Sequence, residues 1–134
     1  MHDARYIDVF HAGVSELFDT VGLGPDYWTS GYGLFNLGMN LDYFRELFDG
    51  DPLRVTVNLL DFNHKLMHVY LELYHEDSGA LCASNERLLI HVNLSTRKSA
   101  PFPQAIAARL DEVRRSCAEH PRPRNLGRTL AIRR

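Results

Sequence analysis

The stretch ARYIDVFHAGVSELFDTV, residues 4–21, decides the fold class because it has the pattern of one long helix with a wide apolar side. Asp3 precedes it as a natural N-cap, and Gly22, Gly24 and Pro25 end it. The apolar arc covers about half of the helix circumference, which predicts a helix embraced by a sheet. Its members are Tyr6, Val9, Phe10, Gly13, Val14, Leu17, Phe18 and Val21.

Four segments with strict two-residue alternation follow this helix. Apolar residues alternate with mostly polar ones over residues 35–43, 53–59, 67–74 and 88–94. Alternation of this kind, with one wet face, is typical of antiparallel strands. Residues 61–64 and 76–79 have the composition of hairpin turns.

The end of the chain has a second helix and a basic tail. Residues 101–103, Pro-Phe-Pro, stop the last strand, and a helix is predicted over about residues 104–119. The tail over residues 121–134 contains five arginines and is expected to be solvated or locally docked. We therefore predict an α+β fold in which residues 1–120 form one domain and residues 121–134 form a basic tail.

Composition narrows the function classes. The chain has 134 residues, 45% of them hydrophobic, and a formal net charge of −2, so no overall basic field recruits nucleic acid. It has neither a signal pattern nor a membrane-spanning apolar run, so we expect a cytoplasmic protein without membrane or nucleic-acid partners. His64 and His68 are four residues apart, a spacing that on a strand separates them by about 13 Å, so no shared metal site is predicted.

Several motifs resemble those of the hot-dog-fold acyl-CoA thioesterases, the family of 4-hydroxybenzoyl-CoA thioesterase-like proteins. Residues 1–6, Met-His-Asp-Ala-Arg-Tyr, look like the end of the Gly-His-Val/Met-Asn-Asn/Asp-x-x-Tyr motif that opens the family's central helix. Residues 43–47 and 50–53 resemble its second and third strands. Residues 86–93 and 100–103, with Gly127-Arg128 in the tail, are similar to one branch, the betainyl-CoA thioesterases and the thioesterase domains fused to some carnitine dehydrogenases.

This resemblance implies a fold and an activity. The fold is a long central helix wrapped by a curved antiparallel sheet, paired into homodimers or homotetramers. The activity is hydrolysis of a short or polar acyl-CoA thioester, such as betainyl-CoA, to the free acid and CoA, without a metal or redox cofactor. The alternative is a non-catalytic hot-dog protein that binds acyl-CoA or only assembles.

The family motif also raises an expectation about the start of the chain. Family members carry an Asp a few residues before the Gly-His pair, at the end of a first strand, whereas this sequence begins at Met1, inside the motif. We therefore expect the 134-residue chain to be weakly active or inactive, and less stable than an N-terminally extended version.

Three residues are the catalytic candidates: Asp3, Glu86 and His2. Glu86 shares a strand face with Leu88, and an acid that faces an apolar layer suits general acid or base catalysis, whereas an ion pair with Arg87 or Arg45 is the structural alternative. His2 stands beside the expected active centre. The free amides of the helix start, from Asp3 through Ala4, Arg5 and Tyr6, are candidates to hold the thioester oxygen.

Further side chains are predicted to bind the rest of the substrate. Arg97 and Lys98, and then Arg87, are the candidates for the phosphates of coenzyme A, or else are plain surface charges. Trp28 and Tyr32 belong to an aromatic cluster that lines an acyl pocket, cages a trimethylammonium group, or serves core or dimer packing. Tyr43 completes the predicted substrate contacts.

Overall fold

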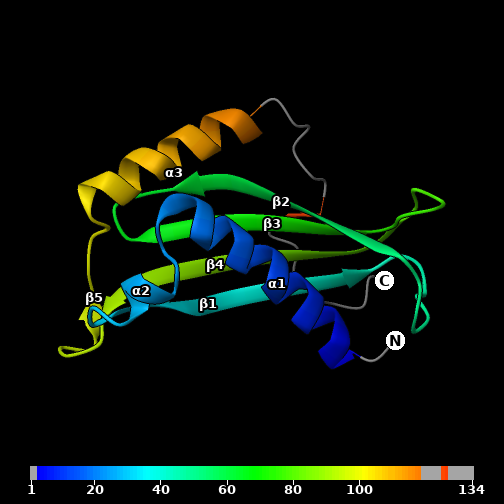
Figure 1. Ribbon diagram of the computed structural model, residues 1–134, viewed down its shortest axis with the longest axis horizontal. Helices are drawn as coiled ribbons and strands as arrows, with labels where there is room; N and C mark the ends of the chain where they lie inside the picture. The colour runs from blue at the N-terminus through cyan, green and yellow to red at the C-terminus, as the bar shows by residue number, and fades with distance from the viewer. Residues whose placement is uncertain (1–2, 119–124, 127–134) are drawn as a thin grey trace, which may run out of the picture.

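The computed structural model describes residues 3–118 and 125–126. One face of a curved antiparallel sheet wraps around a long helix (Figure 1). The long helix is α1 (Asp3–Val21), so it starts one residue earlier than predicted. The remaining elements are α2 (Pro25–Trp28), β1 (Tyr32–Tyr43), β2 (Leu53–Phe62), β3 (Leu66–His75), β4 (Leu81–Asn93), β5 (Lys98–Ser99) and α3 (Gln104–Cys117). The predicted α+β hot-dog architecture with a C-terminal helix is confirmed.

The strand order leaves two edges. The sheet runs β1-β4-β3-β2 with every neighbouring pair antiparallel, and β5 adds a short pairing to β4. Helix α3 lies along β2 and packs Ile106 and Leu110 into the core (Figure 1). The outer edge of β1 has no such cover among the described elements, since β1 pairs only with β4.

The core lies between α1 and the sheet. Phe10, Val14 and Val21 on the apolar side of α1 are buried against β3, where Val69 and Leu71 are fully buried. Gly13 is part of this contact: a Cβ atom there would lie 2.9 Å from Val55 Cγ1. The glycine therefore lets the helix backbone approach the sheet closely.

A bulge in β1 changes which residues share a face. The pairing of β1 with β4 slips between Asn36 and Gly38, and a slip of one residue exchanges the faces that the following side chains occupy. Phe35 pairs with Ile90 on the face away from α1, whereas Met39 pairs with Arg87 on the face toward it. The predicted single alternation over residues 35–43 is therefore wrong for Phe35.

The inward face of β4 is the opposite of the one predicted. Leu89 is 3% exposed and faces α1, whereas Leu88 is 37% exposed on the other face. The inward set includes the polar residues Asn85, Arg87 and His91, whereas Leu88, Ile90 and Val92 belong to the outward set, so the apolar pattern favours the wrong face. The strand also begins at Leu81, seven residues before the predicted segment at 88.

The connections agree with the predicted turns, with one addition. Asn63 organises the β2–β3 turn, its Oδ1 accepting from the amides of Lys65 and Leu66. Gly79, with a φ of 70°, is in the β3–β4 turn. The short helix α2 was not predicted. No described helix is both long and apolar enough to cross a membrane.

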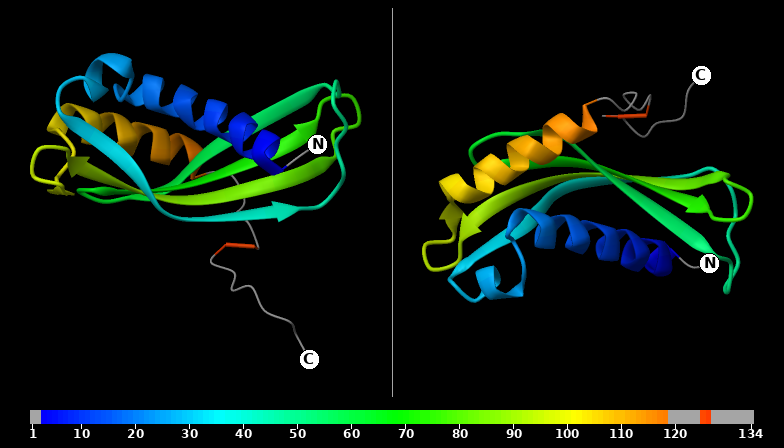
Figure 2. Two further views of the ribbon diagram at one scale, coloured as in Figure 1. Left: turned by 90° about the horizontal axis from the view of Figure 1, so that it is seen from below. Right: turned by 45° about the horizontal axis from the view of Figure 1, so that its top comes forward.

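The face of the sheet away from α1 receives one residue of the basic tail. The segment 125–126 lies on that side, below the sheet in the left view of Figure 2. Asn125 Nδ2 donates to Asp42 Oδ2 at 2.7 Å and to Ser84 Oγ at 2.9 Å, and Tyr70 donates its hydroxyl to Asn125 Oδ1 at 3.1 Å. The tail is thus locally docked at Asn125, and the predicted boundary near residue 120 lies outside the described residues.

Candidate functional site

The first group of predicted site residues lies at the start of α1. Ala4 and Arg5 are exposed there, and Tyr6 is buried with its ring edge-on to Tyr43, 5.0 Å between centroids. The first amides of a helix have no intrahelical acceptor, so this end carries free N–H groups and partial positive charge. His2 and the side chain of Asp3 lie outside the described part of the chain, and their catalytic roles stay predictions.

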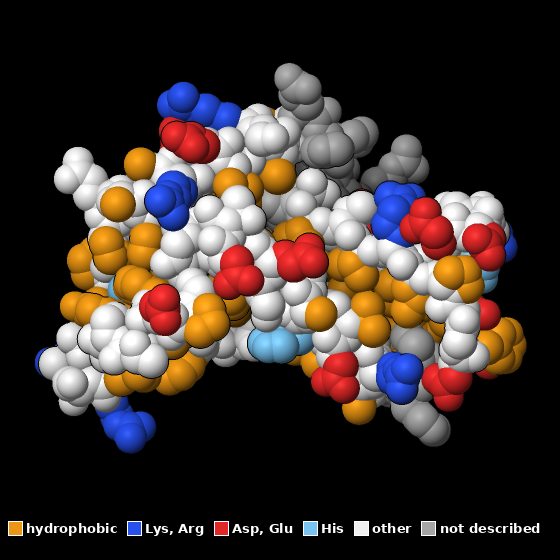
Figure 3. Space-filling view, viewed as in Figure 1, with side chains coloured by type: hydrophobic (Ala, Val, Ile, Leu, Met, Phe, Trp, Pro, Cys, Tyr) orange, Lys and Arg blue, Asp and Glu red, His pale blue; other side chains and the backbone are white. Residues whose placement is uncertain are grey.

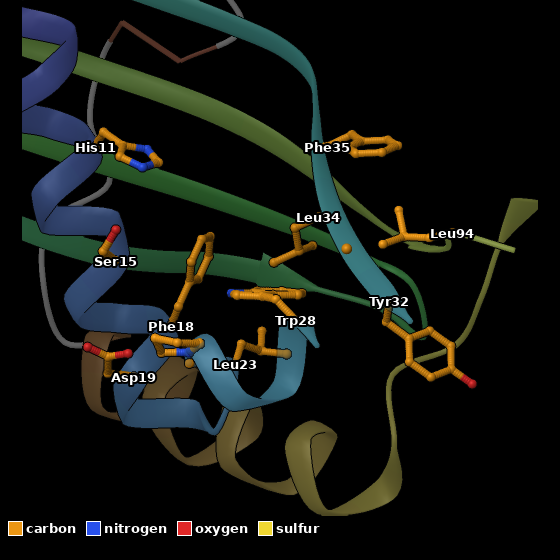
Figure 4. A pocket seen from close by; sticks show the side chains of 13 residues that line it. His11, Ser15, Phe18, Asp19, Leu23, Trp28, Tyr32, Leu34, Phe35 and Leu94 are labelled. Carbon is orange, nitrogen blue, oxygen red and sulfur yellow. The ribbon is translucent and has the colours of Figure 1, made fainter. Parts of the chain in front are cut away.

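The second group surrounds a cavity of about 560 Å³ between α1, α2 and the start of β1. Trp28 and Tyr32, the predicted acyl-binding aromatics, both line it. Figure 4 shows Phe18, Trp28 and Leu34 pointing toward one another between α1 and β1. Apolar side chains also gather at this end of the molecule, over α2 and the start of β1 (Figure 3).

The polar groups of this aromatic cavity come from one face of α1. His11, Ser15 and Asp19 follow each other at four-residue spacing, and all three line the cavity (Figure 4). None of the described residues that line it is a lysine or arginine. The side chains therefore combine aromatic faces with one carboxylate, an arrangement that favours a cation with apolar substituents.

A hydrogen bond between the buried His91 and the half-buried Tyr27 supports this cavity from behind. His91, on β4, is fully buried, and its Nδ1 lies 2.8 Å from the carbonyl oxygen of Ala100 while Nε2 bonds the hydroxyl of Tyr27. Burial, and next to it the neighbouring Tyr32, raises the pKa of the Tyr27 hydroxyl. In the alternation over residues 88–94, His91 falls in the set of Asn93 and not in that of Leu88 and Ile90, so the sequence did not predict this role. The apolar Leu89, two residues earlier in the same set, was the available signal.

Glu86 lies on the other face of the sheet. Its Oε2 is 2.6 Å from His68 Nε2, and Asn40 Nδ2 donates to its Oε1 at 3.3 Å. These three side chains line a second cavity of about 370 Å³ with Gly38, Met39 and Leu88. Glu86 therefore does not face the core layer under α1, and its carboxylate contacts His68 and Asn40. No sequence pattern joins His68 to Glu86, since the pair depends on strand register.

The three predicted phosphate ligands do not lie together. Arg97 and Lys98 are exposed around the β4–β5 turn, where Arg97 has a φ of 57°. Arg87 is 2% exposed on the face toward α1, and its Nε donates to Asn85 Oδ1 at 2.5 Å. Burial lowers the pKa of this guanidinium, and its Nη2 has no hydrogen-bond partner among residues 3–118 and 125–126. Pairing Arg87 with the other two as a surface ligand was therefore wrong, because its side chain is enclosed.

Within one chain, the start of α1 and the aromatic cavity are separated along the helix. The cavity-lining residues from His11 to Asp19 lie 8 to 16 residues after Asp3, which is about 12–24 Å at 1.5 Å per residue. Tyr6 contacts the Tyr43 end of β1, whereas the cavity includes Tyr32 at the other end of the strand. Among the described residues, no group of three or more His, Cys, Asp or Glu side chains is placed to hold a metal.

Comparisons with known proteins place these features in a family. Residues 1–110 match the model of the thioesterase-like superfamily. The chain is 31% identical over 133 residues to the betainyl-CoA thioesterase of Pseudomonas aeruginosa, covering 98% of this chain and 84% of that protein. It is 25% identical to the L-carnitine dehydrogenase/betainyl-CoA thioesterase of Rhizobium meliloti, of which it spans 27%.

Solved structures give the same result for the fold. A Staphylococcus aureus protein solved in complex with CoA superposes with a TM-score of 0.92 at 30% identity, covering 99% of this chain and 84% of that one. A Pseudomonas putida protein described as a putative thioesterase superposes with a TM-score of 0.85 at 28% identity, covering 100% and 86%. The resemblance drawn from residues 1–6, 43–53 and 86–103 is confirmed.

Proposed function

Because this chain belongs to the thioesterase-like superfamily, we propose that it hydrolyses a short acyl-CoA whose acyl group carries a quaternary ammonium, as betainyl-CoA does. The predicted reaction class, thioester hydrolysis, is confirmed by the relatives. The nature of the acyl group is our proposal. Water attacks the thioester carbon, the C–S bond breaks, and the products are the free acid and CoA. The reaction is a hydrolysis without oxidation or reduction, and its only co-substrate is water.

The aromatic cavity is the observation that carries the acyl assignment. A trimethylammonium group is apolar at its surface and positive overall, so it is bound by aromatic faces and a nearby carboxylate. Trp28, Phe18 and Tyr32 supply the faces and Asp19 supplies the charge. The name of the Pseudomonas aeruginosa relative points to the same acyl group.

Polarisation of the thioester oxygen is assigned to the amides at the start of α1. Developing negative charge on that oxygen is stabilised by donors that are already in place and by the positive end of the helix. Asp3, the first residue of α1, is the candidate acid–base group at this end. Glu86 with His68 is the candidate on the opposite face of the sheet.

Two copies of the chain are proposed to complete the site. Edge strands related by a two-fold axis run antiparallel, so pairing through β1 brings the Tyr43 end of one protomer toward the Tyr32 end of its partner. The start of α1 in one protomer then approaches the aromatic cavity of the other. Exposed apolar residues on β1, Phe35, Leu37 and Met39, support this pairing.

CoA and the cellular compartment complete the proposal. The Staphylococcus aureus relative was solved with CoA, and Arg97 and Lys98 are exposed cations that suit its phosphates. Cys82 and Cys117 are both free, which supports a reducing compartment such as the cytoplasm.

A pair of matched substrates tests the acyl assignment. Betainyl-CoA and 3,3-dimethylbutyryl-CoA have the same shape, but the first has a nitrogen cation where the second has carbon. We expect kcat/KM to favour the cationic thioester by roughly 2- to 30-fold, the range of ordinary cation–π contacts. Asp19→Asn should reduce this preference. Equal rates on both substrates would contradict the acyl assignment, and CoA binding without hydrolysis of any thioester would favour the non-catalytic alternative.

A further inference from the structure

We propose that His91 is a positioning residue that fixes the aromatic wall of the acyl cavity and thereby sets its selectivity for a cationic acyl group. The inference rests on the proposed function, because the wall matters only if the acyl group enters the aromatic cavity. Neither His91 nor Tyr27 lines the cavity itself. Both lie behind Trp28 and Tyr32, which do.

The hydrogen bonds of the imidazole define its role. The carbonyl oxygen of Ala100 is only an acceptor, so Nδ1 of His91 carries the hydrogen that bridges the 2.8 Å between them. In the neutral ring Nε2 then has a lone pair, and the Tyr27 hydroxyl donates to it. His91 therefore connects the segment before α3 to α2 through one fully buried ring.

Aromatic contacts connect His91 to the two rings that line the cavity. Tyr27 packs edge-on against Trp28, 5.1 Å between centroids, and stacks on Tyr32 at 5.9 Å. Tyr32 also stacks directly on the His91 ring at 5.2 Å, and Phe102 packs against it at 4.9 Å. Trp28 therefore packs against Tyr27, which His91 holds, and Tyr32 packs against both Tyr27 and His91.

The backbone around His91 makes it a rigid support. Its amide donates to the carbonyl of Lys65 at 2.8 Å, and its carbonyl accepts from the amide of Ala100 at 3.0 Å. By contrast α2 is a single turn of four residues without a side-chain cap. A helix this short is marginal on its own, so the Tyr27–His91 bond is an important restraint on the orientation of Trp28.

Two substitutions remove this bond from opposite ends. His91→Phe keeps a stacked ring but removes both hydrogen bonds, and Tyr27→Phe removes only the hydroxyl. Leu89→Val is the matched control, since Leu89 is buried on the same face of β4, two residues away and outside the aromatic wall. The double variant His91→Phe/Tyr27→Phe closes a mutant cycle.

Selectivity and fluorescence are the readouts. Trp28 is the single tryptophan of the chain, so quenching of its emission by tetramethylammonium chloride reports occupancy of the cavity without any catalysis. We expect both single variants to lower the preference for betainyl-CoA over 3,3-dimethylbutyryl-CoA at least about twofold, mainly through KM, and to weaken the quenching. The double variant should resemble either single one, whereas Leu89→Val should lower the melting temperature and leave both readouts unchanged.

The results distinguish this inference from the proposed function. If the wild-type chain shows substrate preference and quenching, and Tyr27→Phe and His91→Phe keep both, then His91 is only a structural residue and the inference is overturned. If the wild-type chain shows neither, the acyl assignment fails and the inference falls with it. Additive effects in the double variant would also overturn it, because the two side chains would then act separately.

Discussion

Nε2 of His68 lies 2.6 Å from Oε2 of Glu86, on the face of the sheet that α1 leaves uncovered. The proposed acyl cavity and the start of α1 are on the other side. We therefore expect Glu86→Gln to lower stability by about 1–3 kcal/mol, the range for a lost hydrogen bond to a charged group, and to change kcat less than about threefold. Thermal melting and turnover on an acyl-CoA substrate measure the two effects.

The opposite result would assign the chemistry to Glu86. The sequence predicted Glu86 as a general acid or base, and loss of such a group lowers turnover at least about 100-fold. A loss of that size with an unchanged melting temperature would place hydrolysis at the second cavity. His68→Asn is the companion variant, because it removes the imidazole and keeps the carboxylate.

The outer edge of β1 predicts self-association. Leu37 is 57% exposed at the bulge of this strand, and Phe35 and Met39 flank it at 54% and 40%. We expect a dimer or larger species at micromolar concentration, and Leu37→Lys should shift it toward the monomer because a charge on an edge strand opposes pairing. Sedimentation equilibrium measures the mass. Phe48→Lys is the control, since Phe48 is similarly exposed, at 63%, outside β1. A monomeric wild-type chain would refute the prediction.

Residue patterns predicted the elements well and their faces less well. The long helix, four main strands and α3 all follow from local periodicity, which needs no knowledge of neighbouring segments. The bulge at Asn36–Gly38 and the inward face of β4 depend on register, and in β4 the inward set includes the polar residues Asn85, Arg87 and His91. Local pattern therefore could not place Phe35 or Leu88.

Individual site residues show the same limit. Trp28 and Tyr32 were found because aromatic residues cluster in the sequence near the end of α1. His68 joins Glu86, and His91 joins Tyr27, across 18 and 64 residues of chain. Such pairs are created by strand register and by the packing of α2, so composition and spacing did not predict which residues would meet. Leu89 indicated only that His91 shares a face with an apolar residue.

Asn125 is predicted to hold the tail against the sheet. Its side-chain amide bonds three residues, Asp42, Ser84 and Tyr70, each of which is at least nine-tenths buried. Asn125→Ala should cost about 1–3 kcal/mol, because each buried polar group loses a partner. Asn125→Asp should cost more, since it puts a second carboxylate beside Asp42. Chemical denaturation measures both, and unchanged stability in both variants would show that the tail is dispensable.

Replacement of Gly13 by alanine is predicted to destabilise the chain, although alanine is normally the better residue in a helix. Alanine is favoured over glycine inside helices by about 1 kcal/mol. Here a Cβ would lie 2.9 Å from Val55 Cγ1 and 3.2 Å from Leu71 Cδ2, so either these side chains or the helix must shift. We expect Gly13→Ala to be destabilising by about 1–3 kcal/mol, the range for overpacked cores. Ala12→Gly, at the neighbouring exposed position, should cost only the helix preference; a stabilised Gly13→Ala variant would contradict the close contact.

Stability is predicted to fall at alkaline pH, and Tyr27 is expected to contribute. Burial raises the pKa of the Tyr27 hydroxyl above the value of about 10 that it has in the unfolded chain. A group with a raised folded pKa contributes stability that is fully present below the unfolded pKa and lost as pH rises through the folded pKa. Between these two values the unfolded state has released the proton and the folded state has kept it, so the free energy of unfolding falls by up to about 1.4 kcal/mol per pH unit.

Urea unfolding of the wild-type chain and Tyr27→Phe from about pH 8 to pH 11 measures this, and the variant should show the shallower decline. Equal slopes would mean that the Tyr27 hydroxyl releases its proton as easily in the folded chain as in the unfolded one, which would contradict its burial behind the aromatic cavity.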